Sequence, residues 1–188
     1  LAVATLWVHR SKGLARLCLP LAAIFALLHT LLSAKSHFYQ LGYLMEMSLQ
    51  WMSPLLLMTL LFQSFSSKEY YVFRIVIALT FIGHGLYAVG YYPVPGNFQD
   101  MMMNSLGVDR NYAINLLYLA GILDFFAALL LLFPNKKWAV WGLYYIIVWG
   151  VLTTFARLWS YMDLVSMEGM FLRWFPETLL RWVHFLMP

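Results

Sequence analysis

Ionisable side chains inside an otherwise apolar chain are the residues whose chemistry most needs an explanation. Eight of them fall within or beside long apolar stretches: His29, Glu46, Arg74, His84, Asp124, Arg157, Arg173 and Glu177. A charged side chain at membrane depth costs at least about 2.5 kcal/mol, so such residues normally face the interior of a helical bundle. They are therefore candidates for a functional site.

The composition predicts an integral membrane protein. Of the 188 residues, 63% are hydrophobic and 11% are charged, whereas a soluble domain carries roughly 25% charged residues. The apolar runs reach the roughly 20 residues that a membrane-spanning helix needs. The stretches between them are too short for an independent soluble domain. We predict an all-α fold, a bundle of five transmembrane helices plus a sixth C-terminal helix that is spanning or interfacial, with residues 1–188 forming a single polytopic membrane domain.

The five predicted spans cover about residues 14–33, 41–62, 70–91, 112–133 and 138–159. The last apolar segment, about 167–187, differs because Arg173, Glu177 and Arg181 recur four residues apart and form one charged stripe. Such a stripe fits an interfacial helix, or a sixth span that packs against the bundle or docks on a partner. Residues 1–8 are too short to span and fit the tail of a further helix.

Basic residues at the helix ends predict the orientation. With the N-terminus inside, the cytoplasmic ends hold most of the lysines and arginines, namely Arg10, Lys12, Arg16, Lys68, Arg74, Lys136 and Lys137. This distribution agrees with the positive-inside tendency. We therefore expect a multi-pass protein of the cell (inner) membrane with a cytoplasmic N-terminus. Because the net charge of +4 comes from helix ends, it does not indicate a nucleic-acid partner.

The longest connection, about residues 92–111, has features of a structured loop. Pro93, Pro95 and Gly96 favour an extended turn, and the apolar residues from Phe98 to Leu106 fit one short amphipathic helix. Loops of this length in compact bundles are often functional. We expect an extracytoplasmic cap over the outer mouth of the bundle.

Depth estimates place three ionisable residues at one level in the outer half of the bundle. A helix rises 1.5 Å per residue, which puts His29, Glu46 and His84 roughly 21–24 Å from the inner boundary and Asp124 at about 14 Å. Gln50 follows Glu46 by one turn on the same face. Each residue also has a structural interpretation, as a hydrogen-bonded histidine or a buried ion pair. The candidate ligand-binding or proton-relay residues are His29, Glu46, Gln50, His84, Tyr87 and Asp124.

Small residues surround two of these candidates. His84 lies between two glycines, and Asp124 has Gly121 one turn away, so neighbouring helices or a ligand can approach closely. Two histidines and a carboxylate also suit a metal, but no local ligand motif is present and we predict no metal site. Arg74 and Arg157 fit topology anchors or interfacial residues. The single cysteine, Cys18, cannot form an internal disulfide.

Several motifs follow one another between Arg74 and Arg157. An arginine opens the span RIVIALTFIGHGLYAVG, a Leu106-Gly107 element follows, and the helix LAGILDFFAALLLLFP combines a small and an acidic residue. In these features the chain resembles the DoxX-like membrane proteins, with a core at about residues 70–160. The resemblance implies a four-helix membrane core, often tied to quinone- or thiol-linked redox chemistry, and points to His84 and Asp124. The chain lacks a redox cysteine pair, which argues against direct thiol chemistry.

Three functions are compatible with the sequence. The first is an integral membrane subunit or accessory protein of a larger membrane complex, for example a redox or respiratory one, that docks through Arg173, Glu177 and Arg181. The alternative is a small DoxX-like protein that binds a quinone or another lipophilic ligand and assists proton or electron transfer. The third is a proton-coupled transporter, although no inverted repeat is evident. Since no catalytic constellation is complete, the sequence does not decide whether the protein is an enzyme. The expected partners are the lipid bilayer and other membrane subunits; a quinone is one candidate cofactor, whereas no metal or haem is expected.

Overall fold

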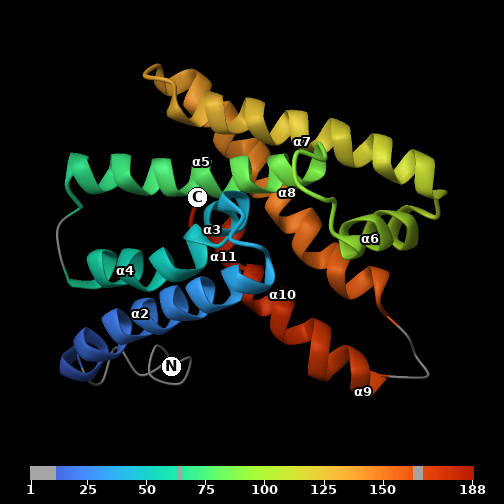
Figure 1. The fold of residues 1–188 in the computed structure, drawn as a ribbon. Helices are drawn as coiled ribbons and strands as arrows, with labels where there is room; N and C mark the ends of the chain where they lie inside the picture. Colours follow the sequence, from blue (N-terminus) through green and yellow to red (C-terminus); the bar gives the residue numbers. More distant parts are fainter. Residues whose placement is uncertain (1–11, 63–64, 163–166) are drawn as a thin grey trace.

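The chain folds into long helices that lie along broadly the same axis, with α8 crossing the others obliquely (Figure 1). The computed structural model describes residues 12–62, 65–162 and 167–188, so the segment 1–8 lies outside the described residues. Within those ranges every regular element is a helix. The helices that form the bundle are α2 (Lys12–Ser36), α3 (Leu41–Glu46), α4 (Ser48–Phe62), α5 (Ser67–Ala88), α7 (Arg110–Leu132) and α8 (Lys136–Ser160).

Among the residues that the structure describes, five helical runs are long and apolar enough to cross a membrane. They are Lys12–Ser36, Leu41–Phe62, Ser67–Ala88, Arg110–Leu132 and Lys136–Ser160. Large apolar side chains on their outward faces are exposed, among them Leu32 at 77% and Trp141 at 66%. Exposed apolar side chains on this scale suit contact with lipid rather than water. The predicted all-α membrane bundle is confirmed.

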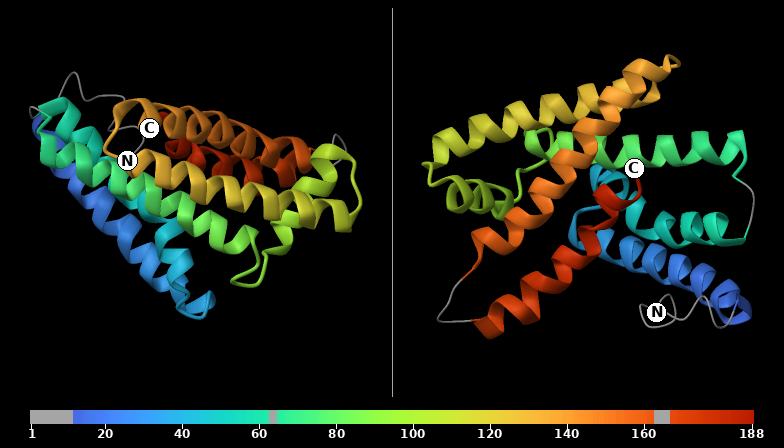
Figure 2. Two further views of the ribbon diagram at one scale, coloured as in Figure 1. Left: turned by 90° about the horizontal axis from the view of Figure 1, so that it is seen from above. Right: turned by 180° about the vertical axis from the view of Figure 1, so that it is seen from behind.

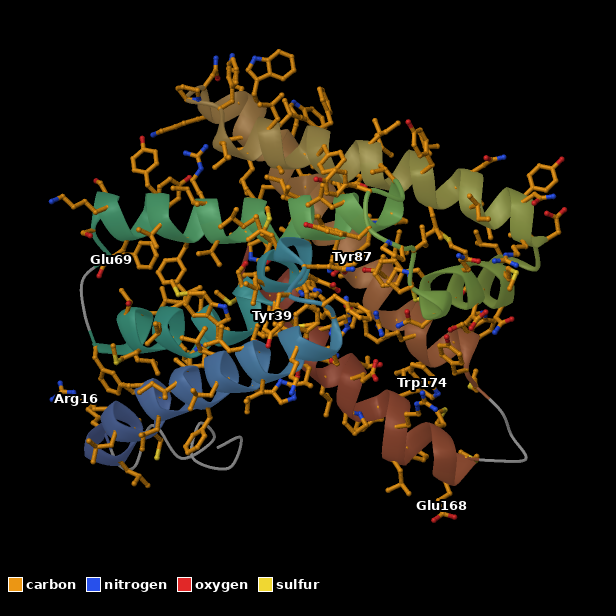
Figure 3. The ribbon with its side chains drawn as sticks, in the orientation of Figure 1. Arg16, Tyr39, Glu69, Tyr87, Glu168 and Trp174 are labelled. Atoms are coloured by element: carbon orange, nitrogen blue, oxygen red, sulfur yellow. The ribbon has the colours of Figure 1, made fainter. Side chains whose placement is uncertain are left out.

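Local capping explains where several helices begin. The Ser66 side chain accepts a hydrogen bond from the Glu69 N–H, and Glu69 accepts one from the Ser66 N–H, which forms a capping box at the start of α5 (Figure 3). Asp109 caps α7 and Asn135 caps α8 by accepting from backbone N–H groups of the first turn. These polar residues fix the helix starts to within a few positions of the predicted spans.

The second predicted span is not one continuous helix. The chain turns at Met47, so that α3 is seen nearly end-on in Figure 1 while α4 runs across the view. When its amide oxygen faces His184, the Gln50 side chain turns its nitrogen to the carbonyls of Glu46 and Met47 (3.2 and 3.0 Å). Backbone groups freed by a broken helix at membrane depth must find such partners. The break places Glu46 at the C-terminal end of the short helix α3, next to α5.

The long loop contains the amphipathic helix that the sequence predicted. It is α6 (Gly96–Leu106), and Gly107 ends it in a left-handed conformation (φ 66°) that glycine adopts without strain. Helix α6 packs against both α7 and α8, at the end where these two helices diverge (Figure 2). It therefore fills the space between two spans rather than lying apart from them.

The C-terminal segment turns back along α8 into the bundle (Figures 1 and 2). It consists of α9 (Met167–Gly169), the π-helical turn η1 (Met170–Trp174), α10 (Phe175–Arg181) and α11 (Val183–Leu186). The ring of Trp174 stacks on Tyr161 with centroids 3.7 Å apart, which joins its start to the end of α8. Partial burial raises the pKa of the Tyr161 phenol, so the stacked ring stays neutral. At its far end, α11 contacts α8 and α4.

Candidate functional site

A buried carboxylate joins three separate helices at the centre of the molecule. Glu46 Oε1 accepts from Arg181 Nη2 of α10 at 2.8 Å and lies 3.2 Å from His84 Nε2 of α5. Arg181 Nη1 lies 3.4 Å from the same His84 nitrogen. The Glu46 and His84 side chains are only 7% and 12% exposed, so the three groups form a cluster shielded from solvent.

Two glycines allow His84 to reach this position. A Cβ on Gly83 would lie 2.5 Å from the Glu46 nitrogen, which means that α5 and α3 approach more closely than any larger residue permits. A Cβ on Gly85 would lie 3.0 Å from the Gly121 carbonyl oxygen of α7. Small residues in membrane bundles serve this purpose. The glycines on either side of His84 therefore bring one neighbouring helix each against α5.

A second histidine extends the cluster. His184 of α11 is 1% exposed, and its ring meets His84 edge-on with centroids 5.1 Å apart. His184 Nε2 lies 3.1 Å from the Gln50 amide, whose oxygen accepts from it when the amide nitrogen donates to the α3 carbonyls. Gly150 of α8 makes room, since a Cβ there would lie 2.9 Å from the His184 carbonyl oxygen. The C-terminal segment thus supplies two members of the cluster.

A second ion pair joins α8 to α10. Arg157 Nη1 lies 2.9 Å from Glu177 Oε2; the arginine side chain is 4% exposed and the glutamate side chain 45% exposed. The Arg157 Nε is also buried, and no described residue provides it with a hydrogen-bond acceptor. A buried charged donor without an acceptor destabilises the folded protein, so the Arg157 Nε is a candidate contact for a ligand.

Asp124 occupies a separate position on α7. It is 2% exposed, and its Oδ1 accepts a hydrogen bond from the Tyr145 hydroxyl of α8 at 3.0 Å. Gly121 lies one turn before it and packs against Ala88 at the end of α5 and against Val89, which follows it. Asp124 therefore lies in the α5–α7–α8 core, where it supplies a carboxyl group at the edge of the cluster.

The cluster borders a small internal cavity, which we call the polar chamber. Its volume is about 50 Å³, and its lining includes four ionisable side chains: His84, Asp124, Arg157 and Arg181. Met101 and Met102 of α6 close it on one side. The chamber is therefore bounded by α5, α6, α7, α8 and α10, and it contains no residue of α2.

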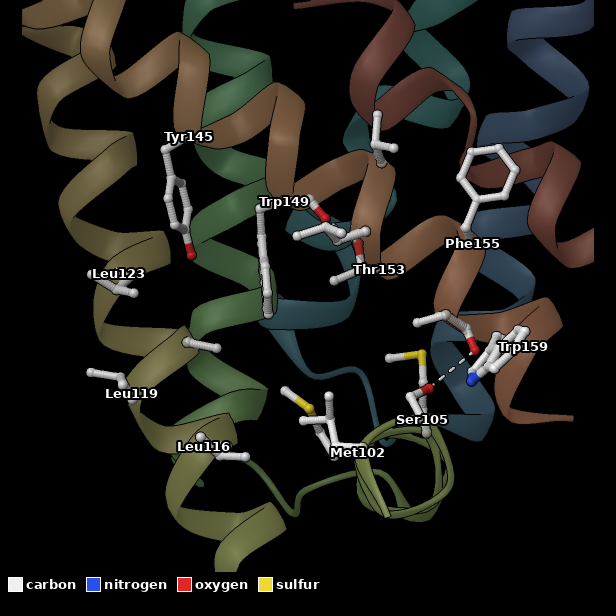
Figure 4. A pocket seen from close by; sticks show the side chains of 16 residues that line it. Met102, Ser105, Leu116, Leu119, Leu123, Tyr145, Trp149, Thr153, Phe155 and Trp159 are labelled. Carbon is white, nitrogen blue, oxygen red and sulfur yellow. Dashed lines mark hydrogen bonds between the residues drawn. The ribbon is translucent and has the colours of Figure 1, made fainter. Parts of the chain in front are cut away.

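A larger cavity between α6, α7 and α8 adjoins the chamber, and we call it the apolar groove (Figure 4). Its volume is about 560 Å³. Side chains of Leu116, Leu119 and Leu123 line it from α7, facing Tyr145, Trp149 and Thr153 on α8. The two cavities share five lining residues: Met101, Met102, Ala120, Trp149 and Thr153. They are therefore neighbouring parts of one site.

Comparison with known protein families gives a match in the central part of the chain. Residues 78–166 match the DoxX-like family. The matched segment contains the whole lining of the apolar groove and the whole lining of the polar chamber except Arg181. The predicted resemblance is thus confirmed over somewhat less than half of the chain. No curated protein and no solved structure matches the chain.

The structure brings four of the predicted site residues to the cluster or the polar chamber, and it places the other two elsewhere. Glu46, Gln50 and His84 belong to one cluster, and Asp124 lines the chamber. His29 is exposed on α2 and so lies outside this buried site, although its estimated depth was similar. Tyr87 points away toward α2 and α3, where its hydroxyl donates to Gln40 Oε1 at 2.8 Å (Figure 3).

Four residues of the site differ from their predicted roles or had no predicted role. Arg181 and Glu177 were expected on a docking stripe, but both pair with other helices of the same chain, which leaves Arg173 as the exposed member. Arg157 was expected at the interface and is instead buried against the chamber. His184 follows Arg181 by three residues, a spacing that puts both on one helix face, and this was the available signal.

Arg74 has a structural role at the C-terminal end of α7, away from the cluster. Its guanidinium donates to the carbonyl oxygens of Leu131 and Phe133, where α7 ends. These carbonyls have no partner within the helix, so the arginine satisfies them.

Among the described residues, no group of three histidine, cysteine or acidic side chains is placed to hold a metal ion.

Proposed function

We propose that this membrane protein binds a lipophilic ligand taken from the bilayer. The apolar part of the ligand would occupy the apolar groove, and its polar end would enter the polar chamber. One observation carries this proposal: the groove and the chamber share lining residues, so an apolar cavity leads directly to buried hydrogen-bonding groups.

The groove also opens on the lipid-facing surface. Its lining includes Leu119, Leu152 and Trp159, which are 52%, 54% and 63% exposed. Small-molecule sites typically have volumes of about 300–1,000 Å³ and combine apolar walls with a few polar groups. The groove, at about 560 Å³, falls within that range. A ligand dissolved in the bilayer would enter sideways without crossing water.

A quinone is one ligand that fits this description. Its carbonyl oxygens would accept hydrogen bonds from His84 or from the arginines of the chamber, while its apolar tail would lie in the groove. The Glu46–His84 contact joins the chamber to a second titratable group, which suits transfer of a proton to or from the bound ligand. The resemblance to DoxX-like proteins points the same way.

A role as a membrane subunit or accessory protein is the second candidate. It is supported by the exposed side of the C-terminal segment, where Arg173 lies over the Trp174 ring (5.0 Å) beside Leu172, which is 73% exposed. A partner helix would cover this surface.

A proton-coupled transporter gains no support, because the ionisable groups gather in one cluster rather than along a path.

We further propose the inner membrane as location, with a cytoplasmic N-terminus. The start of α2, with Lys12, and the starts of α5 and α8, with Lys68 and Lys136, lie at the same end of the bundle (Figure 1). Positive charge gathered at one end supports a cytoplasmic position for that end. Helix α6 and the groove would then lie in the outer half.

The binding proposal is tested by filling the groove. Leu119→Trp adds bulk inside it, whereas Leu129→Trp adds the same bulk on another exposed position of α7 that is not part of its lining. Lipids and quinones that co-purify in mild detergent are extracted and quantified by mass spectrometry. We expect a bound species in the parent protein and in Leu129→Trp, and its loss in Leu119→Trp. Equal retention by both variants would contradict binding in the groove.

A further inference from the structure

The charges around the polar chamber are not balanced within it. Arg157 and Arg181 both line the chamber, and the Glu46 carboxylate bonds to Arg181. The partner of Arg157 is Glu177, whose side chain is 45% exposed and therefore compensates a buried charge less effectively. Asp124 also lines the chamber, where its carboxyl accepts from the neutral Tyr145 hydroxyl. The lining thus holds two arginines and one acidic side chain, and the partner of Arg157 is partly exposed.

One atom of Arg157 lacks a hydrogen-bond partner in the part of the chain that the structure describes. The Nε of Arg157 is buried, and among the described residues it has no acceptor. Leaving a buried donor unsatisfied costs about 1–3 kcal/mol, and more for a charged group. The guanidinium is a planar fork that can donate from Nε and Nη2 to both oxygens of one carboxylate. A ligand in the chamber that offers a hydrogen-bond acceptor would provide the Arg157 Nε with the partner that it lacks among the described residues.

We propose that the ligand of this site is a single-chain amphiphile with a carboxylate head, such as a long-chain fatty acid. The carboxylate binds the Nε edge of Arg157 in the polar chamber, and the acyl chain lies in the apolar groove. This inference rests on the proposed function and specifies its ligand class. Arg157 would provide the positive charge and the hydrogen bonds for the carboxylate. His84 and Arg181 would form further parts of the chamber wall.

The size of the chamber restricts the head group. Its volume is about 50 Å³, and about 10–15 Å³ on a comparable measure is enough to hold one water molecule. The chamber is therefore much smaller than the groove of about 560 Å³, which favours a small head group such as a carboxylate. The groove is lined at its chamber end by Trp149, which also lines the chamber. This tryptophan is a natural reporter of an occupied site.

The test compares ligands that share a chain and differ in the head group. The protein is placed in nanodiscs of neutral phosphatidylcholine, and a brominated octadecanoate is titrated while tryptophan fluorescence is recorded. Because the chain has eight tryptophans, Trp149→Phe defines the part of the quenching that arises at the site. Octadecanoate, octadecanol and decylubiquinone are then added as competitors. We expect octadecanoate to displace the probe at about tenfold lower concentration than octadecanol, since the alcohol lacks the charge and the second acceptor.

The outcomes separate this inference from the proposed function. If the alcohol or the quinone displaces the probe as well as the carboxylate does, the carboxylate assignment is wrong and binding in the groove still holds. If the probe gives no quenching that depends on Trp149, and none of the three competitors changes the signal, both fail.

A matched pair of variants tests the role of Arg157. Arg157→Lys keeps the positive charge near Glu177 but removes the fork, whereas Arg173→Lys makes the same exchange at an exposed position of the C-terminal segment. We expect about tenfold weaker octadecanoate binding in Arg157→Lys, unchanged octadecanol binding, and no change in Arg173→Lys. Undiminished preference for the carboxylate in a folded Arg157→Lys protein would overturn the assignment. If that variant does not fold, the head-group comparison in the parent protein decides.

Discussion

Glu46 Oε1 lies 2.8 Å from Arg181 Nη2, although 135 residues separate the two in the chain. The same carboxylate oxygen lies 3.2 Å from His84 Nε2. One buried side chain thus holds the short helix α3, the span α5 and the C-terminal segment together. Removing one partner of a buried ion pair leaves an uncompensated charge, which is far more costly than replacing both.

Glu46→Gln should therefore destabilise the protein by about 3 kcal/mol, because Arg181 keeps its charge and loses its carboxylate. The measurement is thermal or denaturant unfolding in mild detergent. The double variant Glu46→Gln with Arg181→Met should recover part of this loss. Additive effects of the two substitutions would show that the pair is not coupled.

Gly83→Ala should disturb the contact between α3 and α5. The added Cβ would lie 2.5 Å from the Glu46 nitrogen and 2.8 Å from the Gly42 carbonyl oxygen, and these are backbone atoms that cannot rotate away. We expect a loss of about 1–3 kcal/mol in the free energy of unfolding. Gly169→Ala is the control, because no atom lies within 4 Å of its added Cβ. Equal melting temperatures for the two variants would refute the close approach.

Asp124 should tolerate an amide better than an apolar side chain. Asp124→Asn keeps an acceptor for the Tyr145 hydroxyl, whereas Asp124→Leu leaves that buried hydroxyl without its partner and should cost about 1–3 kcal/mol. In a Tyr145→Phe background the penalty of Asp124→Leu should shrink. The cycle compares the free energies of unfolding of the parent protein, Asp124→Leu, Tyr145→Phe and the double variant. A penalty of Asp124→Leu that persists in the Tyr145→Phe background would rule out this explanation.

The proposed orientation predicts which ends of the helices are accessible from outside. Cys18→Ser removes the single native cysteine, and Ser67→Cys or Asn111→Cys then places a thiol at an exposed position at either end of the bundle. A membrane-impermeant maleimide should label Asn111→Cys in intact cells and Ser67→Cys only after permeabilisation. The reverse pattern would invert the topology.

The five spans could be predicted from the sequence because membrane-length apolar runs and helix caps are local features. The contact between Glu46 and His84 was partly predictable as well, since depth follows from helix rise. Depth does not give helix rotation, however, and so His29 was grouped with them although it faces outward on α2. The break at Met47 and the inward fold of the C-terminal segment depend on tertiary contacts, which explains why Arg181 and His184 were not assigned to the site.

The DoxX-like match contains the apolar groove and all of the polar-chamber lining except Arg181, whereas Glu46, Arg181 and His184 come from the chain on either side of the matched residues. The site thus combines one contiguous segment of the chain with three side chains from its flanks. A protein that had the matched segment alone would keep the walls of both cavities. It would lack Glu46 and Arg181, the two charged groups that contact His84.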